Sequence, residues 1–293
     1  MTLIAALFVI LTQGPGDPAR LFEYDRGAPL DFRVSAEEIV DGATVQDVSY
    51  ASARKGRVPG YLVRPAGDGP FAGIVYMHWG QGDRTEFLSE AVLLAKRGAV
   101  SLMIDAPYHR PDIESYNFVA DPEAEREGYI QLVCDLRRGL DLLASRKDVD
   151  PKRVGYVGHS LGATWGGALA GIEARFAGYV LMGGLPRLTD VLGDDSYAKL
   201  MQQAFTREQL ERYVEVLSPI NPELLVGRAT PGSILFQFAR HDRFISDGSA
   251  RDYVKAAGDS HKVRWYFTSH EFNDPDSPRD RVEFLAKKLA LAP

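Results

Sequence analysis

From residue 44 onward, the sequence alternates short apolar runs with longer amphipathic segments. The first two runs, 44–52 and 57–65, alternate apolar and polar residues with a period of two, which predicts an antiparallel pair of strands. The later runs are apolar throughout and have the length of strands buried on both faces, at 72–78, 99–107, 153–159, 177–184, 233–242 and 262–270. This pattern predicts an α/β fold, a doubly wound, mostly parallel eight-stranded sheet with helices on both faces.

The amphipathic segments between the runs are the expected helices, at 84–98, 121–146, 160–175, 206–218, 246–258 and 277–292. Residues 185–225 are longer than a single crossover, and we interpret them as a small cap inserted over the strand ends; an ordinary long crossover is the alternative. We therefore expect an N-terminal segment at 1–40 and one α/β domain at 41–293.

The N-terminal segment contains an apolar stretch from Leu3 to Leu11, with no lysine or arginine before it. The stretch is too short to span a bilayer but has the length of a signal-peptide core. A signal peptide at 1–14 would place the protein outside the cytoplasm, in the periplasm or secreted. A terminal helix or strand packed on the domain, in a cytoplasmic protein, is the alternative.

The charge balance argues against a nucleic-acid partner, and the cysteine count excludes an internal disulfide. The chain has 34 Lys and Arg against 40 Asp and Glu, a net charge of −6 without a basic cluster, which argues against a nucleic-acid partner. The single cysteine, Cys134, excludes an internal disulfide and lies where a helix core residue is expected. No segment reaches the length of a membrane span. The oligomeric state is left open.

The stretch "YVGHSLGATWGG" at 156–167 places Ser160 between Gly158 and Gly162, after a predicted strand and before a predicted helix. A sharp strand-to-helix turn exposes a serine hydroxyl, and the two glycines permit the close backbone approach that such a turn needs. The positive end of the following helix faces the negative charge that develops during attack on a carbonyl group. A serine that only caps this helix is the alternative.

A nucleophilic serine needs a histidine and an acid nearby. Among the six histidines, His270 ends the last predicted strand and begins a loop at the carboxyl edge of the sheet. Asp242 lies at the exit of the preceding strand, whereas Asp247 looks like the N-cap of the next helix and is the alternative acid. The chain order Ser160, Asp242, His270 differs from the orders of the chymotrypsin and subtilisin triads.

An oxyanion hole needs two amide donors. We expect the first from Leu161, directly after the serine, and the second from Gly80 in the loop "MHWGQGDR", where the lack of a side chain allows a close approach to substrate. Trp79 and Gln81 are the alternatives for the second donor. His78 is expected to brace this loop rather than touch substrate.

Together, the motifs "HWGQG", "IDAP", "GHSLG", "ARHD" and "SHEF" resemble the α/β-hydrolase family, in particular its dienelactone hydrolase and acetyl xylan esterase-like branch. The resemblance runs from about residue 44 to the end and implies hydrolysis without a metal ion or organic cofactor. The sequence departs from the family in the loop His78-Trp79-Gly80, where such families often show His-Gly-Gly, and at Ala239, where glycine is usual. A dienelactone hydrolase proper would carry a cysteine at the position of Ser160.

These features predict a hydrolase that cleaves a small or medium carboxylic ester through a Ser-His-Asp triad. Aromatic side chains expected near the mouth of the pocket are Trp79, Tyr108, His109 and Trp165. A peptidase or amidase of the prolyl-oligopeptidase type is one alternative and would need a site for an amine terminus. A non-catalytic binding protein on the same fold is another, because a fold alone does not establish activity.

Overall fold

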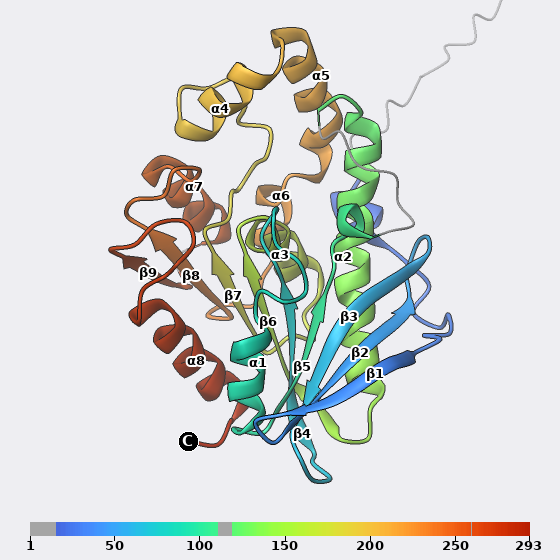
Figure 1. Ribbon diagram of the computed structural model, residues 1–293. Helices are drawn as coiled ribbons and strands as arrows, with labels where there is room; N and C mark the ends of the chain where they lie inside the picture. The colour runs from blue at the N-terminus through green and yellow to red at the C-terminus, as the bar shows by residue number, and fades with distance from the viewer. Residues whose placement is uncertain (1–15, 111–118, 259) are drawn as a thin grey trace, which may run out of the picture.

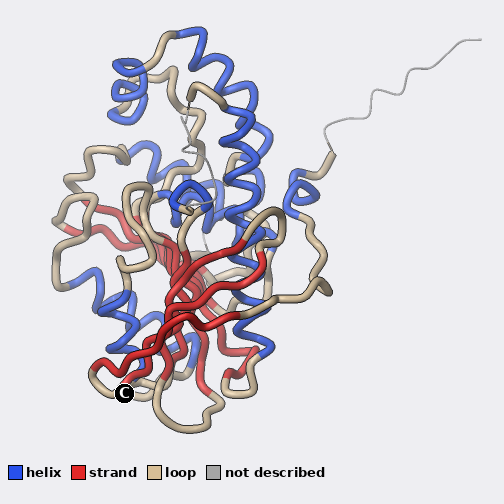
Figure 2. The backbone as a smooth tube through the Cα atoms, turned by 45° about the vertical axis from the view of Figure 1, so that its right-hand side comes forward, coloured by secondary structure: helices blue, strands red, loops and turns tan. Residues whose placement is uncertain are grey.

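A computed structural model describes residues 16–110, 119–258 and 260–293. Its strands form one nine-stranded sheet, twisted through the centre of the molecule, in the order β1-β2-β3-β5-β4-β6-β7-β8-β9 (Figures 1 and 2). β1 to β3 are antiparallel to their neighbours, and β4 to β9 pair in parallel. The strands are Arg33–Val40, Ala43–Ala51, Arg57–Arg64, Phe71–Met77, Ala99–Ile104, Val149–His159, Gly178–Met182, Ile234–Ala239 and Lys262–Tyr266.

Helices cover both faces of this sheet, as predicted. The apolar side chains of α1 and α8 pack with one face, and those of α2, α3 and α7 pack with the other. The α-helices are α1 Leu88–Ala95, α2 Pro122–Ser145, α3 Leu161–Ile172, α4 Ser196–Ala204, α5 Arg207–Leu217, α6 Glu223–Val226, α7 Asp247–Ala257 and α8 Asp276–Leu289. Three short 3₁₀ turns are η1 Pro18–Phe22, η2 Pro107–His109 and η3 Ser218–Ile220.

The antiparallel pair predicted at the start of the sheet is confirmed as β2 and β3, which run in register from Thr44 opposite Arg64 to Ala51 opposite Arg57. The sheet has nine strands rather than the predicted eight, because β1 at Arg33–Val40 pairs antiparallel with β2. Every residue of β1 is exposed, so its sequence lacks the alternation that marks a strand with one buried face.

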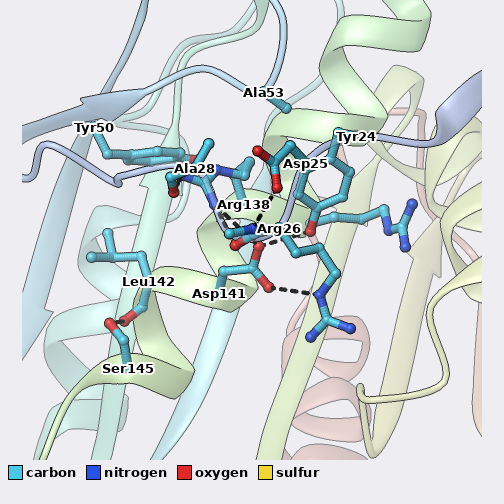
Figure 3. Close-up of polar contacts among 12 residues, drawn as sticks. Tyr24, Asp25, Arg26, Ala28, Tyr50, Ala53, Arg138, Asp141, Leu142 and Ser145 are labelled. Carbon is cyan, nitrogen blue, oxygen red and sulfur yellow. Dashed lines mark hydrogen bonds and ion pairs between the residues drawn. The ribbon is translucent and has the colours of Figure 1, made fainter.

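Residues 24–28 contact α2 through hydrogen bonds and an ion pair (Figure 3). Tyr24 donates a hydrogen bond of 2.8 Å to Asp141, and Arg138 donates one of 2.9 Å to the carbonyl of Ala28. Arg26 forms an ion pair of 3.8 Å with the same aspartate. The signal peptide predicted at 1–14 lies outside the described residues. Within the described part of the chain, no helix has both the length and the apolar character to span a membrane.

The segment 185–225 leaves the sheet after β7 and returns to it at β8. It contains α4, α5 and the start of α6, and α4 and α5 lie beyond the carboxyl end of β7 (Figure 1). Both of these helices have capped starts: Asp195 accepts a hydrogen bond from the amide of Ala198, and Thr206 forms a capping box with Gln209. These caps stabilise the starts of two short amphipathic helices.

Candidate active site

Ser160 occupies the sharp turn between β6 and α3. Its backbone has φ 52° and ψ −106°, in the region that L-residues rarely adopt. A Cβ on Gly158 would lie 2.4 Å from the backbone of Gly162, and a Cβ on Gly162 would lie 2.4 Å from the carbonyl oxygen of Met77 in β4. The two flanking glycines therefore allow the strained turn that exposes the Ser160 side chain.

The structure brings Ser160, His270 and Asp242 into one hydrogen-bonded chain. His270 Nε2 lies 2.8 Å from Ser160 Oγ, and His270 Nδ1 lies 2.7 Å from Asp242 Oδ2. The other carboxylate oxygen of Asp242 accepts hydrogen bonds of 2.9 Å from the amides of Phe244 and Ile245. Because an ionised carboxylate only accepts, Nδ1 carries a proton, and Nε2 is free to accept a hydrogen bond from Ser160 Oγ.

Asp247, the alternative acid, lies in the first turn of α7. Its carboxylate forms ion pairs with Arg240 and Arg251, at 3.6 and 3.3 Å. It does not cap the helix as expected, because the N-cap is Ser246, whose hydroxyl accepts a hydrogen bond from the amide of Ser249. The position at the strand exit therefore identifies the aspartate that contacts the histidine.

A second histidine supports the loop that carries His270. His159 Nε2 lies 2.8 Å from the carbonyl oxygen of His270, and its Nδ1 lies 2.5 Å from Glu86 Oε1. The other oxygen of Glu86 accepts a hydrogen bond of 2.8 Å from the amide of Trp79. Glu86 and His159 thus connect the loop after β4 to the loop after β9. The sequence did not predict the contact between Glu86 and His159, because Glu86 lies in a helical pattern with other charged residues.

The hydrogen bond between the Trp79 amide and Glu86 removes one of the three candidates that the sequence offers for the second oxyanion donor. The amide of Trp79 is occupied by Glu86, which leaves Gly80 and Gln81 as donors in this loop. A Cβ built on Gly80 would meet nothing within 4 Å, so its backbone borders open space. The first donor expected, the amide of Leu161, lies in the first turn of α3, where the amides have no partner within the helix.

His78 braces this loop, as the sequence predicts. Its Nδ1 lies 2.6 Å from the carbonyl oxygen of Trp79, and its Nε2 accepts a hydrogen bond of 3.1 Å from the amide of Ala106. Burial lowers the pKa of His78 to about 4, so the ring is neutral at pH 7 and each nitrogen has one defined role. His109 Nε2 lies 3.3 Å from the carbonyl oxygen of Gly80 and supports the loop from the other side.

Ser160 and His270 open into a cavity of about 400 Å³ whose wall is mainly apolar. One side consists of the loop after β4 and the start of α3. The opposite side comes from α2 and from residues of the segment 185–225. The lining residues are Trp79, Gly80, Gln81, Glu125, Tyr129, Ser160, Leu161, Thr164, Leu185, Leu188, Tyr197, Leu200, Met201, Phe205, Tyr213, Phe244, Ile245 and His270.

Of the four aromatic residues expected near the mouth, Trp79 lines this cavity. Trp165 does not have the expected place: it is 1% exposed in the core, with its ring 4.6 Å from that of Tyr129. Tyr108 and His109 pack around His78, behind the loop. Glu125 was missed, because a glutamate in the run "DPEAEREG" looks like a solvated helix residue. In the described part of the chain, no cluster of three or more acidic, histidine or cysteine side chains is arranged to hold a metal ion.

Comparison with solved structures assigns the fold. An acetyl xylan esterase from Paenibacillus sp. R4 superposes with a TM-score of 0.72 and 20% identity, over 93% of this chain and 92% of that one. Acetyl xylan esterase 1 from Thermoanaerobacterium sp. JW/SL YS485 gives a TM-score of 0.70 and 15% identity over 92% and 91%. An S-formylglutathione hydrolase from Agrobacterium tumefaciens gives a TM-score of 0.65 and 14% identity over 88% and 99%. No family model and no curated protein matches the sequence.

Proposed function

With the α/β-hydrolase fold as the premise, we propose that this protein is a serine hydrolase that cleaves a small or medium carboxylic ester through an acyl-enzyme intermediate. The observation that carries the proposal is the hydrogen-bonded chain Ser160, His270, Asp242, which opens into an apolar cavity. The side chains of His270 and Asp242 are 1% and 2% exposed, so water does not compete for the bond between them.

In the proposed mechanism, His270 Nε2 takes the proton of Ser160 Oγ as that oxygen attacks the ester carbonyl. The amides of Leu161 and Gly80 hold the resulting oxyanion. His270 then gives the proton to the departing alcohol, and the acyl group remains on Ser160. A water molecule, activated by His270 in the same way, releases the acid. Asp242 keeps the imidazole oriented and stabilises its protonated form in both halves of the reaction.

The experiment that tests this compares wild type, Ser160→Ala and His270→Ala on p-nitrophenyl acetate, butanoate, hexanoate and octanoate, with fluorophosphonate labelling alongside. We expect turnover and labelling by wild type, no labelling of Ser160→Ala, and a loss of about 10⁴-fold or more in kcat for both variants. Ser269→Ala is the matched control, because Ser269 is next to His270 but donates its hydrogen bond to Glu271.

Two outcomes would overturn the proposal. Inertness of wild type towards every ester and towards the label would favour a non-catalytic binding protein. Cleavage of an aminoacyl amide in preference to the matching ester would favour the peptidase or amidase.

A further inference from the structure

A buried carboxyl group lies in the wall of the cavity, away from the hydrogen-bonded chain. Glu125 belongs to the first turn of α2, is 2% exposed and lines the same cavity as Ser160. Its Oε1 accepts hydrogen bonds from the hydroxyls of Tyr129, at 2.5 Å, and Tyr213, at 3.3 Å. Its Oε2 has no hydrogen-bond partner among the described residues. One oxygen of this carboxyl group therefore has hydrogen-bond partners, and the other has none among the described residues.

The surroundings of Glu125 favour its uncharged form. Burial raises the pKa of this carboxyl to about 8, although the two tyrosine hydroxyls act in the opposite direction. No lysine, arginine or histidine of the described chain pairs with it. Because Oε1 accepts both tyrosine bonds, the proton belongs on Oε2, which makes that atom a hydrogen-bond donor without an acceptor.

Apart from Glu125, the wall at this end offers apolar side chains and the hydroxyls of Tyr129, Tyr197 and Tyr213, which are hydrogen-bonded to Glu125 or to one another. Tyr213 belongs to α5, and the inserted segment also contributes Leu188, Met201 and Phe205. A polyol would leave most of its hydroxyls against hydrocarbon there, at a cost in desolvation. A ligand with an apolar chain and one oxygen group would instead match both the wall and the free donor.

We propose that Glu125 selects the substrate, with Oε2 donating a hydrogen bond to an uncharged oxygen group, a hydroxyl or carbonyl, that an apolar chain carries away from the cleaved ester bond. This inference rests on the proposed function and adds the substrate class to it. An ammonium group in the same place would require the carboxyl to ionise, and it is the competing ligand that the test separates.

The test measures kcat/KM for p-nitrophenyl hexanoate, 6-hydroxyhexanoate and 6-aminohexanoate, with the four- and eight-carbon homologues, and for hexyl acetate and 6-hydroxyhexyl acetate. The two sets place the polar group on the acyl or the alcohol side. In wild type we expect one hydroxylated ester to exceed its alkyl counterpart by about tenfold, the effect of one satisfied hydrogen bond. Glu125→Gln keeps this ratio because its amide also donates, whereas Glu125→Leu reverses it.

Glu127→Gln is the matched control, because Glu127 lies on the same helix and its side chain is 64% exposed. Thermal melting of each variant checks that it is folded. Hydrolysis of the alkyl esters with the same hydroxyl-to-alkyl ratio in wild type and Glu125→Leu would overturn the inference and leave the proposed function standing. A preference for the amino ester that Glu125→Gln abolishes would overturn it in favour of a cationic ligand.

A binding measurement keeps the inference testable if no ester is cleaved. Calorimetry with 8-hydroxyoctan-2-one and octan-2-one, ketones that resemble the esters, should show about tenfold tighter binding of the hydroxylated ligand to wild type, lost in Glu125→Leu. Equal binding of the two ketones by wild type would contradict the inference, whatever the activity.

Discussion

The two sides of the cavity are built on different principles. On the sheet side, Ser160, His270 and Asp242 come from the ends of parallel strands, and each polar atom between them has a partner. On the opposite side, α2, α4 and α5 present an apolar wall with one half-satisfied carboxyl, that of Glu125. The hydrogen-bonded chain on the sheet side is thus arranged before a ligand arrives. On the other side, one carboxyl oxygen of Glu125 has no hydrogen-bond partner among the described residues.

The largest expected effect tests the sheet side. Asp242→Asn removes the carboxylate that fixes the proton on His270 Nδ1, and we expect kcat to fall by about 10³- to 10⁴-fold with little change in the melting temperature. Asp247→Asn is the control, because Asp247 pairs with exposed arginines. Steady-state ester hydrolysis measures both. Equal loss in the two variants would mean that the acid assignment is wrong.

The sequence predicts the sheet side well for a physical reason. A nucleophile turn needs glycines at fixed spacing, as at Gly158 and Gly162, and parallel strands deliver their following loops to one edge of the sheet. Asp242 and His270 could therefore be chosen from their positions after two strands. These constraints act over a few neighbouring residues, so they are visible in the chain.

The other side could not be predicted, because its properties depend on contacts between distant segments. Glu125 is buried by Tyr213, which lies 88 residues away, and nothing in its local sequence distinguishes it from the exposed Glu127. Trp165 has the sequence context of a pocket residue yet packs in the core. β1 was missed because it is exposed along its whole length and has no pattern to reveal it.

The next prediction tests whether the carboxyl of Glu125, on the side formed by α2, α4 and α5, is uncharged. The pKa of Glu125 is raised from 4.5 to about 8 in the folded protein, so the native state holds one more proton than the unfolded state between these values. Stability from this group is therefore present below pH 4.5 and is lost as the pH rises towards 8. Glu125→Gln does not titrate and avoids this loss.

We expect the stability of Glu125→Gln relative to wild type to increase by about 2–4 kcal/mol between pH 4.5 and pH 8.5. Denaturant unfolding at several pH values measures the difference. Glu127→Gln, on the exposed side of the same helix, should show no such trend. A difference between Glu125→Gln and wild type that is flat with pH would mean that the carboxyl is ionised throughout, and the contrast between the two sides would fail.

A smaller effect on kcat is expected from Glu86, which connects the loops after β4 and β9 through His159 and the amide of Trp79. Glu86→Ala removes the hydrogen-bond partner of His159 Nδ1 and the acceptor for the amide of Trp79, so the loops of His270 and Gly80 lose a shared anchor. We expect kcat to fall by about 10- to 30-fold with a much smaller change in KM. Glu86→Gln should restore most of the activity, because an amide can donate to one partner and accept from the other. A Glu86→Ala variant as active as wild type would show that the anchor has no part in catalysis.

The smallest expected effect concerns the apolar residues on the side formed by α2, α4 and α5. Met201 lines the cavity from α4, and Met201→Ala removes part of its side wall without touching a hydrogen bond. Because a cavity rejects or admits chains by volume, we expect the ratio of kcat/KM for octanoate over butanoate esters to rise by about 3- to 10-fold. Leu192→Ala is the control, since Leu192 belongs to the same segment but is 41% exposed and outside the lining.

If both variants leave the chain-length preference unchanged while Glu125→Leu reverses the hydroxyl-to-alkyl ratio, the side formed by α2, α4 and α5 recognises substrate through the carboxyl of Glu125, and its apolar residues only exclude water. If Met201→Ala shifts the chain-length preference and Glu125→Leu leaves the hydroxyl-to-alkyl ratio unchanged, the shape of the apolar wall selects the substrate rather than the carboxyl of Glu125.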